Sequence, residues 1–232
     1  MPSAVPPPDP VGQRLPQGDV PPGARLVSDR ESRVVLRPLA TPLPLGFLAL
    51  ALSTTVFAAL QLGWIPPEQG RVAGLTALAA TVPLQLLASV MGFLARDPVA
   101  ATGMGLLAGT WGVVALTTLT SPPGATSAGL GVLLVTAGIG MAVPAVSGLA
   151  KLVPAAVMAL AGVRFAVTGI HHLQASATWQ TAAGWVGLAL AVLALYAALA
   201  LELEGSHGRT VVPLGRPGRA EVADEPGVRS QL

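Results

Sequence analysis

One arginine, Arg164, interrupts an apolar run at 152–170 that is long enough to cross a membrane. A charge in such a run costs about 2.5–3.5 kcal/mol on insertion scales, so it usually faces a cavity or a partner. A guanidinium is permanently charged and pairs with carboxylates, and helical spacing places Ala161 and Thr168 on the same face. Arg164 therefore indicates a site for an anionic substrate. The alternative is that its side chain extends to the nearby membrane interface.

Two adjacent histidines, His171 and His172, lie at the predicted outer end of this run. Because the ordinary pKa of histidine is near 6.5, one of them could take up a proton together with a weak acid. The alternative is a pair of polar residues at the interface. No metal or haem cofactor is predicted, because the chain has only three histidines and no cysteine.

Polar side chains recur every fourth residue in a second apolar run, at Thr81, Gln85 and Ser89. This spacing places them on one face of a helix. Hydroxyl groups in such a position most often bind a neighbouring helix. The amide of Gln85 could instead donate to a carboxylate oxygen, so a polar path and an interhelical bond are equal alternatives for this residue.

A segment with two closely spaced prolines precedes the first apolar run. We expect the prolines to hold an extended, partly unpaired backbone at the membrane boundary. Near hydrocarbon, such a backbone requires protein or a water-filled cavity to satisfy it. The predicted pore mouth consists of Thr41, Pro42, Leu43, Pro44, Leu45 and Gly46.

Six apolar segments must position these residues. Of the 232 residues, 52% are hydrophobic and 10% are charged, against about 25% charged in soluble domains, and the mean hydropathy is +0.67. A spanning helix needs about 20 apolar residues. The connections are short, so we predict an all-α membrane protein with six antiparallel transmembrane helices in residues 41–203. The predicted spans are 45–64, 72–95, 99–120, 127–147, 152–170 and 178–201.

Both tails are predicted to be cytoplasmic. Residues 1–40 start with a proline-rich stretch, expected to be disordered, and end with a segment at 24–40 that could lie along the membrane as an amphipathic helix. Residues 204–232 form the C-terminal tail. Lysine and arginine favour the cytoplasmic side, and only Arg71 falls outside. We therefore predict a multi-pass protein of the cell's inner (plasma) membrane. The cytoplasmic basic residues are Arg14, Arg25, Arg30, Arg33, Arg37, Arg96, Lys151, Arg209, Arg216, Arg219 and Arg229.

The residue pattern does not favour an enzyme or a nucleic-acid-binding protein. The predicted spans contain no acidic residue, and the chain has no Ser/His/Asp set, HExxH run or GxxxxGK[ST] phosphate loop. Its basic residues are not interleaved with aromatic ones, as nucleic-acid binding would require. We therefore expect a membrane protein that is neither an enzyme nor an ATP-driven transporter by itself.

Three motifs resemble those of the GPR1/FUN34/YaaH family, the acetate and succinate transporters. The proline segment is similar to the family's Asn-Pro-x-Pro-Leu-Gly signature, with Thr41 in place of Asn. Gly184-Trp185-Val186-Gly187 and the ending Gly-Arg-Thr-Val-Val-Pro-Leu-Gly at 208–215 are similar to the Gly-Trp-Ile-Gly and Gly-Arg-Thr-Val-Leu-Pro-x-Gly motifs. Gln85, Trp111 and Phe165 also fall where the family has Gln, Trp and Phe.

This resemblance implies six helices per protomer, a hexamer, and a pore through each protomer for small monocarboxylates or succinate. It also implies that the proline segment lines one end of the pore and that bulky side chains narrow its centre. Here Leu50, Leu107 and Ala161 hold the positions of the narrowing, which makes it aliphatic and wider. The family's acidic residue near the inner end of the second helix corresponds to Gly92.

The sequence therefore predicts a homo-oligomeric membrane channel or transporter for acetate or a similar small carboxylate. Passage is driven by gradients, and it is either passive or coupled to protons as symport. Two alternatives remain open. One is a membrane scaffold or sensor that kept the fold without transport, and the other is a transporter of another small solute.

Overall fold

The computed structural model describes residues 39–216. The predicted disorder of the N-terminal tail and the amphipathic segment at 24–40 fall almost entirely outside this range. The part of the C-terminal tail from 217 to 232 also lies outside the described residues.

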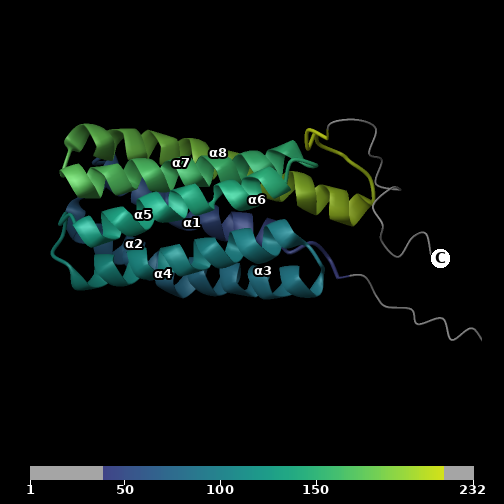
Figure 1. The fold of residues 1–232 in the computed structure, drawn as a ribbon, viewed down its shortest axis with the longest axis horizontal. Coiled ribbons are helices and arrows are strands. Elements are labelled where there is room, and N and C mark those ends of the chain that lie inside the picture. Colours follow the sequence, from purple (N-terminus) through teal and green to yellow (C-terminus); the bar gives the residue numbers. More distant parts are fainter. Residues whose placement is uncertain (1–38, 217–232) are drawn as a thin grey trace, which may run out of the picture. The chain divides into compact units, whose positions relative to one another are not determined.

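Six long apolar helices form the described part of the chain, as the sequence predicts. In Figure 1 they lie side by side in one bundle. Three of them are single helices, and the other three contain short π, 3₁₀ or broken segments. In order, the six are α1 (Leu43–Gln61); η2 (Pro67–Gln69), α2 (Gly70–Thr76), η3 (Ala77–Thr81) and α3 (Val82–Leu94); η4 (Val99–Gly103) and α4 (Met104–Thr120); α5 (Ala128–Gly140) and α6 (Ala142–Ser147); α7 (Leu152–Gln174); and α8 (Ala177–His207).

The second helix contains a π-helical turn, η3, directly before Pro83. Proline has no N–H to donate and its ring crowds the preceding turn. A wider turn is one way in which a helix accommodates this change. The chain therefore crosses the bundle as one continuous helix, Pro67–Leu94.

The proline segment is not extended, and that expectation is wrong. Pro42 has helical backbone angles (φ −82°, ψ −5°), α1 begins at Leu43, and the N–H of Gly46 donates to the carbonyl of Pro42 at 3.3 Å. Prolines fit the first turn of a helix because their N–H groups would have no partner there. The prolines thus begin the helix and do not hold it open.

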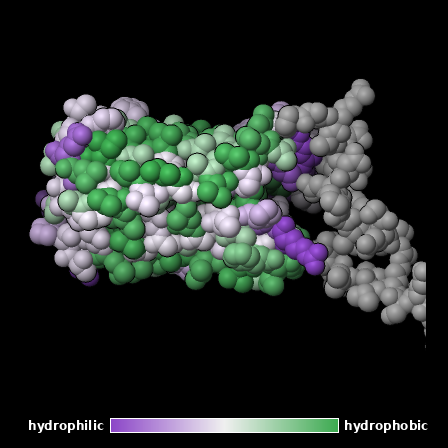
Figure 2. All heavy atoms as spheres, in the orientation of Figure 1, coloured by the Kyte–Doolittle hydropathy of each residue, from purple (hydrophilic) through white to green (hydrophobic). Residues whose placement is uncertain are grey.

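Apolar side chains cover the middle of the bundle, and hydrophilic residues gather at its two ends (Figure 2). Leu86, Phe93, Val132, Ile139 and Val192 are among the large hydrophobic residues that stay exposed. An exposed apolar belt of this extent is expected where lipid takes the place of water. The chain is a multi-pass membrane protein.

Two glycine pairs bring α5 and α7 into direct backbone contact. A Cβ on Gly138 would lie 2.7 Å from the carbonyl oxygen of Gly162, and the reverse distance is also 2.7 Å. Gly131 and Gly169 repeat this relationship at 2.9 and 2.8 Å. Close approach through small residues is how helices pack in lipid.

The chain beyond α8 folds back onto the bundle. Helix α8 continues to His207, past the boundary at 203, and Gly208 then turns the chain with φ +63°. Leu214 is buried, and the carbonyls of Leu214 and Gly215 accept hydrogen bonds from the N–H groups of Val153 (3.1 Å) and Leu152 (3.0 Å). These carbonyls satisfy the first turn of α7.

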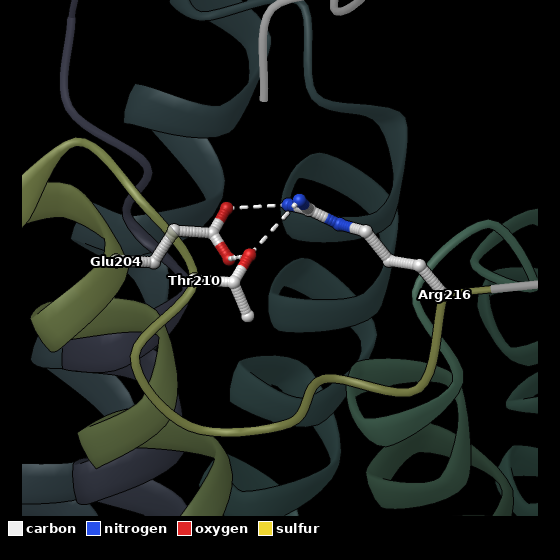
Figure 3. A network of polar contacts seen from close by, with 3 residues as sticks. All are labelled: Glu204, Thr210 and Arg216. Atoms are coloured by element: carbon white, nitrogen blue, oxygen red, sulfur yellow. Dashed lines mark hydrogen bonds and ion pairs between the residues drawn. The ribbon is translucent and has the colours of Figure 1, made fainter. Parts of the chain in front are cut away.

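An ion pair ties this returning segment to α8. Arg216 pairs with Glu204, and Thr210 lies between them, where its hydroxyl contacts both side chains (Figure 3). The side chains of Arg216 and Glu204 are 11% and 10% exposed. We call residues 208–216 the C-terminal clasp.

Candidate functional site

Arg164 lies inside the bundle with only 3% of its surface exposed. Its Nη1 donates to the carbonyl oxygen of Ala183 on α8 at 2.6 Å and to the hydroxyl of Thr168 at 3.0 Å. Its Nε has no hydrogen-bond partner. The side chain is therefore held between α7 and α8 and does not extend to the membrane interface.

No carboxylate in residues 39–216 forms an ion pair with Arg164. The acidic residues in this range are Glu68, Asp97, Glu202 and Glu204, which lie near the ends of the spans. The described bundle thus holds a buried cation without a counter-ion. A buried charge normally requires a partner, because the loss of water is costly.

Arg164 lines a small cavity of about 60 Å³, which we call the chamber. Three aromatic rings form part of its wall. The ring of Trp111 lies 5.3 Å from that of Phe57 and 6.0 Å from that of Phe165, measured between centroids. The complete lining is Phe57, Gln61, Trp111, Val114, Thr118, Leu130, Leu134, Arg164, Phe165, Thr168 and His172.

Three polar atoms of this lining are buried and have no hydrogen-bond partner. They are Nε of Arg164, Nε1 of Trp111 and Oε1 of Gln61. Buried polar groups are almost always paired, so unpaired ones on residues that line a cavity indicate water or a ligand. The chamber can therefore offer both a charge and hydrogen bonds to a small polar molecule.

A larger cavity of about 340 Å³, the vestibule, adjoins the chamber. The two cavities share Phe57, Gln61, Thr118, Leu130 and His172. The vestibule also contains one acidic and one basic residue, Glu68 and Arg71. Its lining comes from helix ends and loops at the end of the bundle opposite to the start of α1 and the end of α8.

Both predicted proton-site histidines line the vestibule, with ring centroids 5.2 Å apart. The backbone N–H of Ser127 donates to Nδ1 of His172 at 3.2 Å. Nδ1 of His171 lies 2.9 Å from the carbonyl oxygen of Ser176, which it can contact only as a donor. Nδ1 of His172 accepts a hydrogen bond and therefore carries no proton, whereas Nδ1 of His171 donates one and therefore carries a proton. The two rings thus have opposite tautomers.

The three polar residues of the second helix, Thr81, Gln85 and Ser89, have two kinds of surroundings. The hydroxyl of Thr81 donates to the carbonyl of Ala49 at 2.8 Å, and that of Ser89 donates to the carbonyl of Ala101 at 2.6 Å. Both therefore bind neighbouring helices. Gln85 is fully buried, and neither atom of its amide has a partner.

The residues assigned to the narrowing lie apart from the chamber lining. Leu50, Leu107 and Ala161 are each 0% exposed and belong to one hydrophobic cluster. Ala161 lies about one turn before Arg164 on α7, toward the start of that helix. Apolar packing thus separates the chamber from the opposite end of the bundle.

The predicted pore mouth lies at that opposite end. Leu43, Pro44 and Gly46 are buried at the start of α1. A Cβ on Gly46 would lie 2.3 Å from Sδ of Met104, so the segment packs directly against the start of α4. Neither the chamber nor the vestibule includes residues 41–46.

Sequence reasoning missed Phe57 and Gln61 of the chamber. Both stand near the end of an apolar run, where an aromatic or a polar residue is common and carries no signal. Trp111 and Phe165 could be noted only through the family resemblance. Arg164 and His172 were marked by their own chemistry.

A solved membrane channel has a similar fold. A solved structure of the bacterial acetate channel SatP matches this chain with a TM-score of 0.67 and 24% sequence identity, over 76% of this chain and 99% of that one. At this identity the likeness shows a shared fold, in agreement with the resemblance of the three sequence motifs. No protein-family model and no curated protein sequence matches the chain.

Proposed function

We propose that this protein is a channel or transporter for acetate or a similarly small carboxylate, driven by the gradient of its substrate. One observation carries the proposal: a buried, uncompensated arginine lines a chamber that adjoins an open vestibule. The shared fold with an acetate channel supports it. So do the proline and C-terminal motifs.

The proposed route passes from the vestibule to the chamber, then between Leu50, Leu107 and Ala161, and leaves at residues 41–46. Gln85, buried without a partner, would offer hydrogen bonds on the apolar side of this route. The fully buried narrowing must open for passage, as gating of a closed pore requires. A coupled proton would travel on the substrate or through His171 and His172.

We further propose that the vestibule faces the outside of the cell, which the charge bias of the sequence supports. In this orientation both termini are cytoplasmic, and Arg71 in the vestibule faces the outside. The family resemblance further suggests a hexamer in the inner (plasma) membrane, with one route in each protomer. Cysteine labelling at Gly63 and at Ser206, in a chain that has no native cysteine, would test the orientation.

Uptake by proteoliposomes tests the function. Labelled formate, acetate, propionate and succinate should be compared with and without a pH gradient, using wild-type protein, Arg164→Ala and empty liposomes. We expect acetate uptake by the wild type and a large loss in Arg164→Ala. Uptake no greater than in empty liposomes would contradict transport and favour a scaffold or sensor. Uptake of ammonium without any carboxylate would favour a different solute, although a buried cation opposes it.

A further inference from the structure

The buried charge of Arg164 needs a counter-ion that the described bundle does not supply. Each described acid lies near an end of a span, and the contacts of Nη1 are to neutral oxygens of Ala183 and Thr168. Hydrogen bonds to neutral groups orient a guanidinium but do not cancel its charge. An anion that enters from solution would remove this cost.

Residues that carry unpaired donors line the chamber from separate helices. Nε of Arg164 on α7 and Nε1 of Trp111 on α4 are both N–H groups without a partner, and both side chains are 3% exposed. The amide of Gln61 on α1 also lacks a partner at its oxygen. Because the two ends of an amide are assigned rather than observed, Gln61 can present its NH₂ group to a ligand.

We propose that the chamber is a binding site for one small monocarboxylate, which it takes in the ionised form. The carboxylate occupies the free donors of Arg164 and Trp111, and its short carbon chain lies among the aromatic rings of the lining. The proposal rests on the proposed function, since the site lies on that route. In the chamber the substrate is held as an anion and is not only passed on as an uncharged acid.

The size and charge of the chamber set its selectivity. A cavity of about 60 Å³ has room for a few water molecules, since one water needs about 10–15 Å³. Formate and acetate suit so small a space, whereas succinate is a longer molecule and carries a second charge. Arg164 is the one arginine or lysine of the lining, so a second carboxylate would remain buried without a permanent cation.

Calorimetric titration of the full-length protein in nanodiscs tests the site directly. Sodium acetate, formate, succinate and chloride should be titrated at pH 7 and at pH 8. Raising the pH by one unit lowers the uncharged acid about tenfold and leaves the anion almost unchanged, because carboxyl groups titrate near pH 4. We expect formate and acetate to bind with the same apparent Kd at both pH values.

The apparent Kd for total acetate would rise about tenfold at pH 8 if only the uncharged acid bound, and this result would overturn the proposal. Equal affinity for chloride would show an unselective anion site and would also overturn it. So would binding of succinate as tight as that of acetate.

Three variants connect the binding to its donors. Arg164→Gln should weaken acetate binding roughly tenfold or more, and Trp111→Phe should weaken it less, in line with charged and neutral hydrogen bonds. Arg96→Gln removes an exposed arginine and should leave the Kd unchanged. If Arg164→Gln does not fold, the pH and anion titrations of the wild type still decide the question.

The site and the transport function can fail separately. Acetate binding that depends on Arg164, without flux in proteoliposomes, would support the site and contradict transport. Acetate flux that Arg164→Gln retains in full would support transport and contradict the site.

Discussion

A Cβ atom on Gly187 would lie 2.9 Å from Nε of Arg164 and 3.0 Å from its Cζ, so the guanidinium packs directly on the backbone of α8. The same Cβ would lie 3.1 Å from the side chain of Ala58 on α1. Three helices thus meet around one charged group. Because Gly187 has no side chain, it leaves the space that the guanidinium fills. This space fixes the position of Arg164.

Gly187→Ala should displace the guanidinium and keep its charge. The crowded neighbour is the end of a flexible side chain, so the fold should persist while the hydrogen-bond geometry is lost. A charge-assisted hydrogen bond contributes about 1.5–3 kcal/mol, so acetate affinity should fall roughly tenfold. Titration calorimetry measures this change. Gly205→Ala, in the same helix with no atom within 4 Å, is the matched control, and unaltered affinity in Gly187→Ala would show that the position of the guanidinium is unimportant.

Gln85→Met should raise thermal stability and lower acetate flux. A buried amide without a partner costs about 1–3 kcal/mol, which an apolar side chain of similar size avoids. If this amide serves passage of a carboxylate, flux should fall even though the protein is more stable. Ser89→Ala is the comparison, because it removes the bond to Ala101 and should lower the melting temperature. Flux that stays at the wild-type level in Gln85→Met would exclude Gln85 from the route.

The sequence was sufficient to predict the six helices, because each of them needs only a long apolar run. It did not determine the residues at which the helices end. Helix α8 continues through Glu202 and Glu204 because glutamate is a good helix former, and it ends at His207, where Gly208 takes the left-handed conformation that ends a helix. Glu204 then pairs with Arg216, a contact across the chain that no local pattern contains. The prolines at 42 and 44 were compatible with a helix start or an open segment, and local rules do not choose between them.

The candidate site was only partly visible in the sequence, for a physical reason. A charge in an apolar run is costly wherever it lies, so Arg164 stands out without knowledge of the fold. Phe57, Gln61 and Gly187 matter because of what packs against them, and this depends on how α1, α4, α7 and α8 meet. The sequence also left open whether Thr81, Gln85 and Ser89 act alike, since only the neighbouring carbonyls distinguish them.

Removal of one partner of the C-terminal ion pair should destabilise the protein more than removal of both. Arg216→Ala leaves the carboxylate of Glu204, which is 9% exposed as a residue, without its cation. Loss of a fully buried partner costs about 3–5 kcal/mol, and we expect about 1–3 kcal/mol here because both side chains retain some contact with water. Glu204→Gln combined with Arg216→Ala should recover part of the loss. Melting temperatures of the two single variants and the double variant form the cycle, and strictly additive effects would show that the pair is not coupled.

The glycine contact between α5 and α7 should not tolerate even one methyl group. In Gly162→Ala the new Cβ would lie 2.7 Å from the backbone oxygen of Gly138, and a backbone atom cannot move aside without moving α5. Overpacking of this kind costs about 1–3 kcal/mol, so the melting temperature should fall.

Gly109→Ala is the control, because it should change the stability of the protein in the opposite direction. Gly109 lies within α4 with no atom within 4 Å of a Cβ, so alanine there should stabilise the helix by about 0.5–1 kcal/mol. Since α5 and α7 also form two walls of the chamber, through Leu130 and Leu134 on one side and Arg164 and Phe165 on the other, Gly162→Ala should weaken acetate binding as well. Equal melting temperatures for Gly162→Ala and Gly109→Ala would mean that α5 and α7 can move apart freely. The chamber would then have no fixed width with which to select its ligand.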